Sequence, residues 1–272
     1  MALLVLVTGA TDGIGLETAR QLVQKGARVI AHGRSQEKLA RLKAELGGNA
    51  ETARADFASL AEVRAMVKDL EARGLAPDVL VNNAGVYLSD REVSADGFEK
   101  TMAVNHLAPF LLTHLLLAGS SGAKLRRIVN VASQVHSGAD LDLADLGGKR
   151  AARYSGYGAY AASKLANVLF TVELAERLRG RGISANSLHP GVVVTKLLRQ
   201  GFGMSGGASA AEGAKTSVFL ASSPEVEGVT GRYFVRERES ATSAAGRDRG
   251  LAKRLYEESA KLVSIDGLPA GK

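Results

Sequence analysis

The chain has 272 residues, no cysteine, and 35 Lys and Arg residues against 28 Asp and Glu residues, which leaves a formal net charge of +7. The lack of cysteine excludes a disulfide scaffold, a thiolate metal site and a cysteine nucleophile, and 46% hydrophobic with 23% charged residues is not the composition of a disordered chain. The basic residues are scattered among acidic ones and form no block of like charges, so we expect no nucleic-acid partner.

Short apolar runs alternate with amphipathic stretches from the beginning of the chain. The runs typical of strands are Leu3–Val7, Arg28–His32, Thr52–Ala55, Val79–Val81, Ile128–Val131 and Ile183–Leu188. The stretches with helical periodicity are 14–25, 36–46, 59–73 and 154–178. Such alternation predicts βαβ units, and hence an α/β fold with a Rossmann-type doubly wound parallel sheet of about seven strands and helices on both faces. No linker or repeat divides the sequence, so we expect one domain over residues 1–272.

One long segment, residues 97–119, is apolar nearly all round. Asn105, His106 and His114 interrupt it, which favours a helix buried against the sheet over a membrane span. We therefore expect a soluble, cytoplasmic protein with no membrane span.

Two later segments differ from this pattern. Residues 192–211 contain several glycines and large apolar side chains, and we interpret them as a substrate lid. Residues 236–250 are polar, and a C-terminal helical tail is expected at about 243–265, with its helix near 250–263.

The first predicted strand ends in the glycine-rich sequence Thr8-Gly-Ala-Thr-Asp-Gly-Ile-Gly15. Glycines at this position let the backbone approach a pyrophosphate, and the N–H groups of the following helix face the phosphate charge. A plain turn between a strand and a helix is the alternative explanation.

After the second predicted strand, no acidic residue is available to bind the ribose 2′-hydroxyl of NAD. Arg34 stands there instead, and its guanidinium suits a 2′-phosphate, so NADP(H) is favoured and NAD(H) remains possible. The alternative is that Arg34 is an ordinary exposed residue at the entry to a helix, and the nearby Asp12 counts against a phosphate.

Tyr160 and Lys164 are spaced i, i+4 at the start of the predicted helix 154–178. On one helix face, an ammonium beside a phenol favours the ionised phenol, which then becomes an acid and base usable near neutral pH. Tyr154 and Tyr157 lack a lysine at this spacing.

Three further features accompany this pair: Asn82-Asn-Ala-Gly85 after the fourth strand, Asn105 within an apolar helix, and Ser133 after the fifth strand. A buried asparagine is costly unless it is hydrogen-bonded, and Ser133 stands at the edge where open α/β sheets bind ligands. Each feature alone has a structural explanation, as turn chemistry, a satisfied core amide or a strand end.

With these motifs in order, the chain resembles the short-chain dehydrogenase/reductase superfamily over residues 3–235. Its T-G-x-x-x-G-x-G motif matches Thr8–Gly15, its N-N-A-G motif matches Asn82–Gly85, and its Y-x-x-x-K motif matches Tyr160 and Lys164. The surroundings of Asn105 and Tyr160, the sequence His189-Pro-Gly-Val-Val193 and Gly231-Arg-Tyr-Phe234 are similar to the retinol dehydrogenase and WW-domain oxidoreductase branch.

The resemblance implies four catalytic residues. Tyr160 would exchange a proton with the substrate oxygen, while Lys164 would lower the pKa of Tyr160 and hold the nicotinamide ribose. Ser133 would hydrogen-bond the carbonyl oxygen, and Asn105 would hold a water of a proton relay.

The resemblance also implies a set of cofactor contacts. Asp56 would meet the adenine, Asn82–Gly85 the adenosine ribose, and Pro190–Val192 with Thr195 the nicotinamide and phosphate side. The expected cofactor-binding residues are Gly9, Thr11, Asp12, Gly13, Ile14, Gly15, Arg34, Asp56, Asn82, Ala84, Gly85, Tyr160, Lys164, Pro190, Gly191, Val192 and Thr195.

The resulting hypothesis is an NADP(H)-dependent oxidoreductase that interconverts a carbonyl and an alcohol on a small to medium, fairly apolar substrate, with no metal. Substrate contacts are expected from Val135, His136, Phe202 and Met204. A non-catalytic NADP(H)-binding redox sensor or scaffold on the same fold is the alternative. Relatives pair through helices equivalent to 97–119 and 154–178, so a homodimer or homotetramer is possible, as is a monomer.

Overall fold

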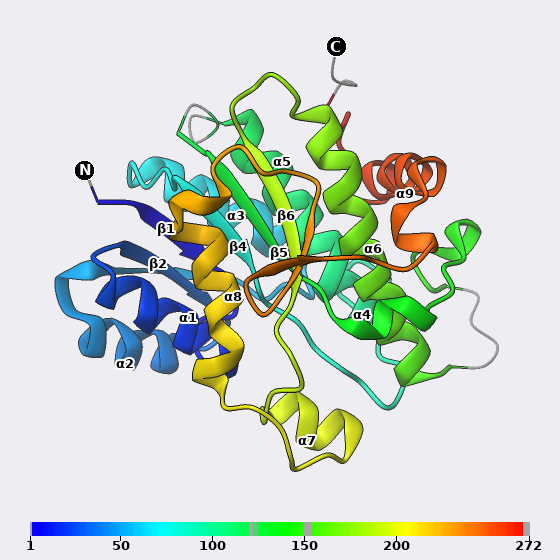
Figure 1. The fold of residues 1–272 in the computed structure, drawn as a ribbon, viewed down its shortest axis with the longest axis horizontal. Helices are drawn as coiled ribbons and strands as arrows, with labels where there is room; N and C mark the ends of the chain where they lie inside the picture. The colour runs from blue at the N-terminus through cyan, green and yellow to red at the C-terminus, as the bar shows by residue number, and fades with distance from the viewer. Residues whose placement is uncertain (1, 120–121, 123, 150–153, 269–272) are drawn as a thin grey trace.

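The computed structural model describes residues 2–119, 122, 124–149 and 154–268, and all its strands belong to one sheet (Figure 1). The strand order is β3-β2-β1-β4-β5-β6-β7-β8. The first seven strands are parallel and β8 is antiparallel to β7. The strands are β1 (Leu4–Val7), β2 (Arg28–Gly33), β3 (Ala50–Arg54), β4 (Val79–Asn82), β5 (Arg127–Val131), β6 (Ser184–His189), β7 (Tyr233–Val235) and β8 (Arg238–Ser240).

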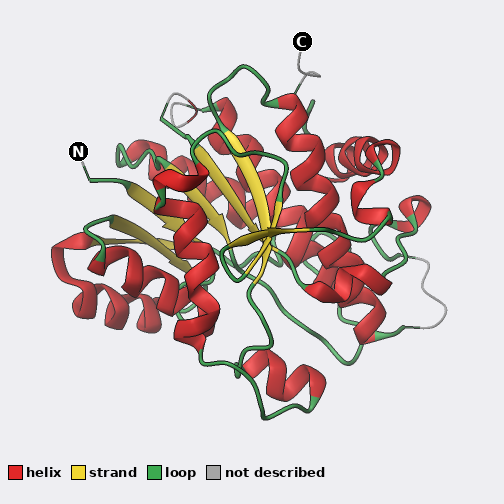
Figure 2. Ribbon diagram, in the orientation of Figure 1, coloured by secondary structure: helices red, strands yellow, loops and turns green. Residues whose placement is uncertain are grey.

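Helices cover both faces of this sheet, as predicted (Figure 2). One face carries α1 (Gly13–Gln24), α2 (Gln36–Leu46) and α8 (Ala210–Ser222). The other carries α3 (Leu60–Ala72), α5 (Ala108–Ala118) and α6 (Gly156–Arg177), with α9 (Arg249–Leu262) outside them. The short helix α7 (Lys196–Phe202) projects from the sheet below α8 in Figure 1.

The central strands are buried from both sides, which explains their continuous apolar sequences. In β1, Val5 and Val7 pack with the helices of the α1 face, whereas Leu6 packs with those of the α5 face. All three side chains are fully buried. A parallel strand between two helical layers has no solvent face, so it shows no alternation of apolar and polar residues.

The eighth strand is a correction to the expectation of about seven strands. Residues 236–250 are polar and β8 is exposed at the surface, but this segment also contains a strand that turns back along β7. The turn residues Arg236 and Glu237 have φ values of 51° and 63°. Such hairpin turns usually contain Asn or Gly, so this turn gave no sequence signal.

The long apolar segment folds as three consecutive helical pieces. They are α4 (Lys100–Met102), a wider π-helical turn over Ala103–Leu107, and α5. Pro109 has no N–H to donate to the carbonyl of Asn105, four residues earlier, and its ring would crowd that carbonyl. The wider turn avoids this conflict, and such turns recur at functional sites. By length and composition Lys100–Ala118 could cross a membrane, but 89% of its most apolar window is buried inside the fold.

The C-terminal helix α9 packs on the outer side of α5 and α6. The Tyr256 hydroxyl of α9 lies 2.6 Å from Nε2 of His114 in α5, and Ser259 Oγ lies 2.7 Å from Nε2 of His106. The Arg177 guanidinium of α6 stacks on the Tyr256 ring at 3.9 Å. Helix α9 thus contacts the long apolar segment through His106 and His114 and α6 through Arg177. The expected pairing through residues 97–119 and 154–178 stays a prediction.

Candidate active site

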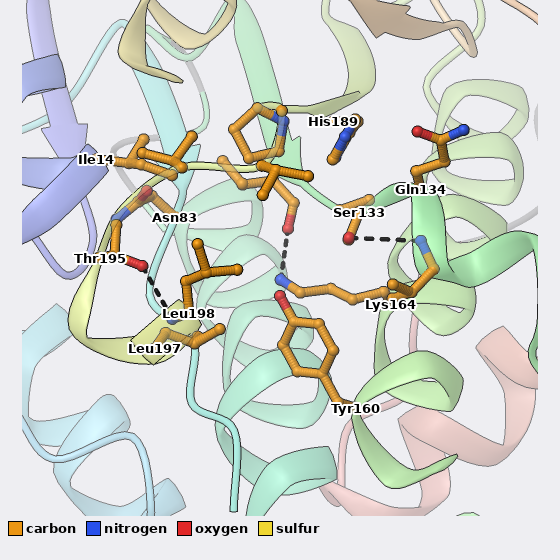
Figure 3. A pocket seen from close by; sticks show the side chains of 18 of the residues that line it. Ile14, Asn83, Ser133, Gln134, Tyr160, Lys164, His189, Thr195, Leu197 and Leu198 are labelled. Carbon is orange, nitrogen blue, oxygen red and sulfur yellow. Dashed lines mark hydrogen bonds between the residues drawn. The ribbon is translucent and has the colours of Figure 1, made fainter. Parts of the chain in front are cut away.

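A cavity of about 390 Å³ opens at the carboxyl ends of the central strands (Figure 3). It brings together residues from the start of α1, the loops after β4, β5 and β6, helix α7 and the first half of α6. Its lining comprises Ile14, Asn83, Gly85, Val131, Ala132, Ser133, Gln134, Val135, Tyr160, Lys164, His189, Pro190, Gly191, Val192, Val193, Thr195, Leu197, Leu198 and Met204. Three of the four expected catalytic residues and six further expected cofactor residues are therefore neighbours around one space.

Tyr160 and Lys164 reach this cavity from one face of α6. The Lys164 Nζ donates a hydrogen bond of 2.8 Å to the carbonyl of Val131, at the end of β5, and lies 5.5 Å from the centroid of the Tyr160 ring. In Figure 3 the Tyr160 hydroxyl points towards this ammonium. The i, i+4 spacing thus places a cation beside the phenol, as predicted from the sequence.

Burial governs the ionisation of both groups. Tyr160 is 7% exposed and Lys164 is 3% exposed. Burial raises the pKa of Tyr160 and lowers the pKa of Lys164 to about 8, because each charged form loses its hydration. Burial thus shifts the pKa of Tyr160 in the direction opposite to the effect expected from Lys164, and that effect stays a prediction.

Ser133 follows β5 and faces the same cavity. Its Oγ accepts a long hydrogen bond of 3.5 Å from the N–H of Val135 (Figure 3). Because this contact uses the oxygen as an acceptor, it leaves the hydroxyl hydrogen for another partner.

Asn105 lies behind the cavity wall and does not line the cavity. Its side-chain nitrogen donates to the carbonyl of Val86 at 2.9 Å and to Ser163 Oγ at 3.0 Å, and its oxygen accepts from the N–H of Val86 at 2.7 Å. The side chain therefore joins the loop after β4 to helix α6. The expected relay water remains a prediction.

The glycine-rich loop has the shape that a bound pyrophosphate requires. Gly9 and Gly13 have φ values of 65° and 54°, which favour glycine. A Cβ on Gly15 would lie 2.2 Å from the carbonyl oxygen of Gly9, so only glycine allows this close packing. Asp12 caps α1 by accepting a 3.0 Å hydrogen bond from the N–H of Gly13. The residues present therefore fit a dinucleotide phosphate at the N-terminus of α1.

The charge of Asp12 is compensated on both sides. Its carboxylate lies 3.2 Å from the ammonium groups of Lys38 and Lys196. Although burial alone would raise the pKa of Asp12, these two lysines lower it. Arg34 is exposed at the end of β2, and within the described residues it has no ion-pair partner.

The loop after β4 differs from the expectation by one residue. Asn82 is buried in the core, where its nitrogen donates to Asn130 at 2.9 Å and to Thr113 at 3.2 Å. Asn83 lines the cavity instead, and its nitrogen donates to the carbonyl of Thr8 at 2.8 Å. The Thr8 hydroxyl accepts hydrogen bonds of 2.9 Å from the N–H groups of Asn83 and Ala84. Thr8 and Asn83 thus fix the two cofactor loops to each other.

His32 is a second link between expected cofactor segments. Its Nδ1 accepts from the N–H of Gly9 at 3.2 Å, so Nε2 carries the hydrogen and donates to the carbonyl of Ala55 at 3.1 Å. The ring stacks on Phe57 at 4.2 Å. Its place between the glycine loop and Asp56 had no signal in the sequence. Half-buried Asp56 itself accepts from the N–H of Ala58 at 2.9 Å.

The expected substrate residues separate into three groups. Val135 and Met204 line the cavity, and Met204 is 45% exposed at its mouth. His136 does not line it and is buried beneath Ser133. Phe202 ends α7, but its side chain lies outside the described part of the structure. His189, which sequence reasoning did not assign, does line the cavity.

Comparison with known proteins gives consistent results. Residues 3–203 match the protein family described as short chain dehydrogenase. Polyprenol dehydrogenase of Mus musculus is 43% identical over 96% of this chain and 84% of its own length. Retinol dehydrogenase 14 of Homo sapiens is 38% identical over 96% of this chain and 86% of its own length.

Among solved structures, a protein from Mycobacterium paratuberculosis superposes with a TM-score of 0.82 at 31% identity, over 98% of this chain and 95% of that one. A blue fluorescent protein from a metagenomic library, in complex with NADPH, gives a TM-score of 0.67 at 31% identity, over 85% and 95%.

Proposed function

Because the chain belongs to the short-chain dehydrogenase family, in its retinol dehydrogenase-like branch, and is therefore an oxidoreductase, we propose that it interconverts an apolar alcohol and its carbonyl compound with a preference for NADP(H). The single observation that carries this proposal is the cavity itself. Ser133, Tyr160 and Lys164 face it on one side, and Ile14 of the glycine-rich motif with residues of the loops after β4 and β6 lines the other.

The bound nicotinamide cofactor would supply or accept the hydride. In the reductive direction, the Tyr160 hydroxyl gives its proton to the carbonyl oxygen as that oxygen gains charge, and the product is the alcohol. The Ser133 hydroxyl donates a hydrogen bond to the same oxygen and stabilises its developing charge. In the oxidative direction, the Tyr160 phenolate takes the proton of the alcohol.

Lys164 supports this proton transfer through its charge. The ammonium is held beside the Tyr160 ring by its hydrogen bond to the carbonyl of Val131. A cation at this place stabilises the phenolate that remains after the proton has left. It thereby opposes the burial that raises the pKa of Tyr160.

NADP(H) is favoured by the charges around the end of β2. Exposed Arg34 offers a permanent cation without an ion-pair partner among the described residues. Asp12, which would repel a phosphate, is paired with Lys38 and Lys196.

An apolar substrate is favoured by the lining of the cavity. Val131, Val135, Val193, Leu197 and Leu198 contribute hydrocarbon to it. Lys164 and His189 are the basic side chains of the described lining, and burial lowers the pKa of His189 to about 4, so that its ring is neutral at pH 7. The names of the relatives, polyprenol and retinol dehydrogenases, also point to apolar alcohols.

The test is oxidation of NADPH and NADH by the purified protein with a panel of apolar aldehydes and ketones, and the reverse reaction with the matching alcohols. We expect turnover with NADPH that falls by at least about a thousandfold in Tyr160→Phe. Tyr157→Phe is the matched control, because Tyr157 is 50% exposed on the same helix, and this variant should keep its activity. Undiminished turnover in Tyr160→Phe would refute the proposal, and cofactor binding without turnover of any substrate would favour a sensor.

A further inference from the structure

His136 makes two hydrogen bonds to the backbone carbonyl of Ser133. The carbonyl of Ser133 accepts one hydrogen bond from the backbone N–H of His136 at 3.2 Å and a second from the imidazole Nδ1 at 2.7 Å. The imidazole is buried and 1% exposed, and it packs edge-on against Tyr233 at 5.0 Å. These two hydrogen bonds restrict rotation of the peptide group that contains the Ser133 carbonyl.

The other ring nitrogen is held from the C-terminal part of the chain. Nε2 of His136 accepts a hydrogen bond of 3.4 Å from the N–H of Ser243, in the segment before α9. The Ser243 hydroxyl in turn accepts from the N–H of Gly246 at 3.1 Å. This segment is far from the active-site residues in sequence but lies against the turn that carries His136.

The two partners determine the tautomer together. A carbonyl can only accept, so Nδ1 must carry the hydrogen, and a backbone N–H can only donate, so Nε2 must be bare. One neutral tautomer satisfies both contacts. The opposite tautomer would place a bare nitrogen against a carbonyl and two hydrogens against each other.

We propose that His136 is a positioning residue: it fixes Ser133 through its carbonyl, and Ser243 holds the ring in the tautomer that does so. This inference rests on the proposed function, in which the Ser133 hydroxyl binds the reacting oxygen. His136 is buried and lies outside the cavity lining, so in this proposal its effect reaches the reaction through the position of the Ser133 hydroxyl. An oxyanion donor is effective only at its correct distance, so a small shift of Ser133 lowers the rate constant of the chemical step.

Two substitutions distinguish loss of the hydrogen bond to the Ser133 carbonyl from loss of the imidazole ring. In His136→Asn the amide nitrogen occupies the place of Nδ1 and can still donate to the Ser133 carbonyl, whereas in His136→Gln the amide is one carbon too far. We expect kcat to fall about five- to tenfold in His136→Gln, the worth of one hydrogen bond, and to recover to within about twofold of wild type in His136→Asn. The KM for NADPH should stay the same in both variants.

His114 provides a matched control. It is buried, and its Nδ1 donates to the carbonyl of Phe110 at 2.7 Å, the same kind of contact at the same length. Because it lies in α5 away from the cavity, His114→Gln should lower the melting temperature with kcat unchanged. A His136→Gln variant that behaves like His114→Gln would overturn the proposal, because the role of His136 would then be structural only.

A spectroscopic measurement is independent of activity. Nitrogen-15 chemical shifts of the ring at pH 7.5, assigned by comparison with His136→Asn, should show hydrogen on Nδ1 rather than on Nε2. Hydrogen on Nε2 would overturn the proposal whatever the kinetics. Hydrogen on Nδ1 in a wild-type protein that turns over no substrate would support the contact with Ser133 and refute the proposed function alone.

Discussion

Asn105 and Val86 are joined by two reciprocal hydrogen bonds, one from the amide nitrogen to the Val86 carbonyl and one from the Val86 N–H to the amide oxygen. The pairing ties the π-helical turn before α5 to the loop after β4, which carries Gly85 at the cavity. An asparagine is suited to this place because its short side chain carries a donor and an acceptor on two separate atoms.

Removing this pairing should destabilise the protein and slow its reaction. In Asn105→Ala both Val86 groups lose their partner, and we expect the free energy of unfolding to fall by about 2–4 kcal/mol. Ser163→Ala leaves both Val86 bonds in place and removes the third contact of Asn105 together with the hydrogen bond from the Ser163 hydroxyl to the carbonyl of Tyr160, which should cost about 1 kcal/mol. Urea unfolding of both variants measures the difference, and equal losses would contradict the role assigned to Val86.

Gly15 is the position of the phosphate loop with the least room. In Gly15→Ala the new methyl group would meet the Gly9 carbonyl, so we expect a loss of about 1–3 kcal/mol in stability and a large loss of cofactor affinity. Gly48→Ala is the control, since no atom lies within 4 Å of its added Cβ. NADPH fluorescence titration and thermal unfolding are the measurements. Wild-type affinity in Gly15→Ala would show that the phosphate is bound elsewhere.

Arg34 should determine the choice between the two cofactors. Arg34→Ser removes a charge-assisted contact to the 2′-phosphate, so kcat/KM for NADPH should fall about 10- to 100-fold, while that for NADH stays the same. Arg41 is an exposed arginine of α2 that is paired with Glu37 of the same helix. Arg41→Ser should therefore change neither value. Equal losses for both cofactors in Arg34→Ser would argue against a 2′-phosphate site there.

The reductive rate should decline in alkaline solution. Burial lowers the pKa of Lys164 to about 8, so its ammonium is present below pH 8 and lost above it. Burial raises the pKa of Tyr160, so its hydroxyl keeps its proton in the same range. We therefore expect kcat/KM for reduction to fall above about pH 8, as measured from pH 6 to 10. A constant value up to pH 10 would contradict a role for the Lys164 charge.

Acid should destabilise the fold through its buried histidines. Burial lowers the pKa of His32, His106, His114 and His189 to about 4, against an ordinary value of 6.5. Their neutral form is therefore favoured by folding, and this stabilisation is complete above pH 6.5 and is lost as the pH falls towards 4. Urea unfolding at pH 7.5, 6 and 5 measures the loss. His32→Gln should show a shallower dependence by up to one proton, and an unchanged slope would mean that His32 is already charged in the fold.

Much of the site could be predicted because its signals are local. The i, i+4 spacing of Tyr160 and Lys164 determines a shared helix face whatever surrounds it. The glycine loop likewise follows from one strand and one helix that are adjacent in sequence. Ser133 follows from the rule that the carboxyl ends of parallel strands meet at one edge.

Other parts depend on contacts between distant segments. Asn82 and Asn83 differ by one position at a strand end, and the direction of each side chain follows from the alternation of the strand. The Ala- and Ser-containing helix α8 has weak contrast between its faces, so its periodicity gave no prediction. His136 lies three residues after Ser133, and only the turn geometry and its partner Ser243 direct its ring inwards.

The packing of α9 against α5 and α6 also has a consequence for folding during synthesis. His114 and Tyr256 are 142 residues apart, yet each satisfies the buried polar atom of the other. Until α9 has left the ribosome, His106 and His114 of the nascent chain have no partners from it, and the helix surfaces that it contacts are uncovered. Packing of α9 therefore follows its emergence, and until then chaperones that bind exposed apolar helices have access to these surfaces.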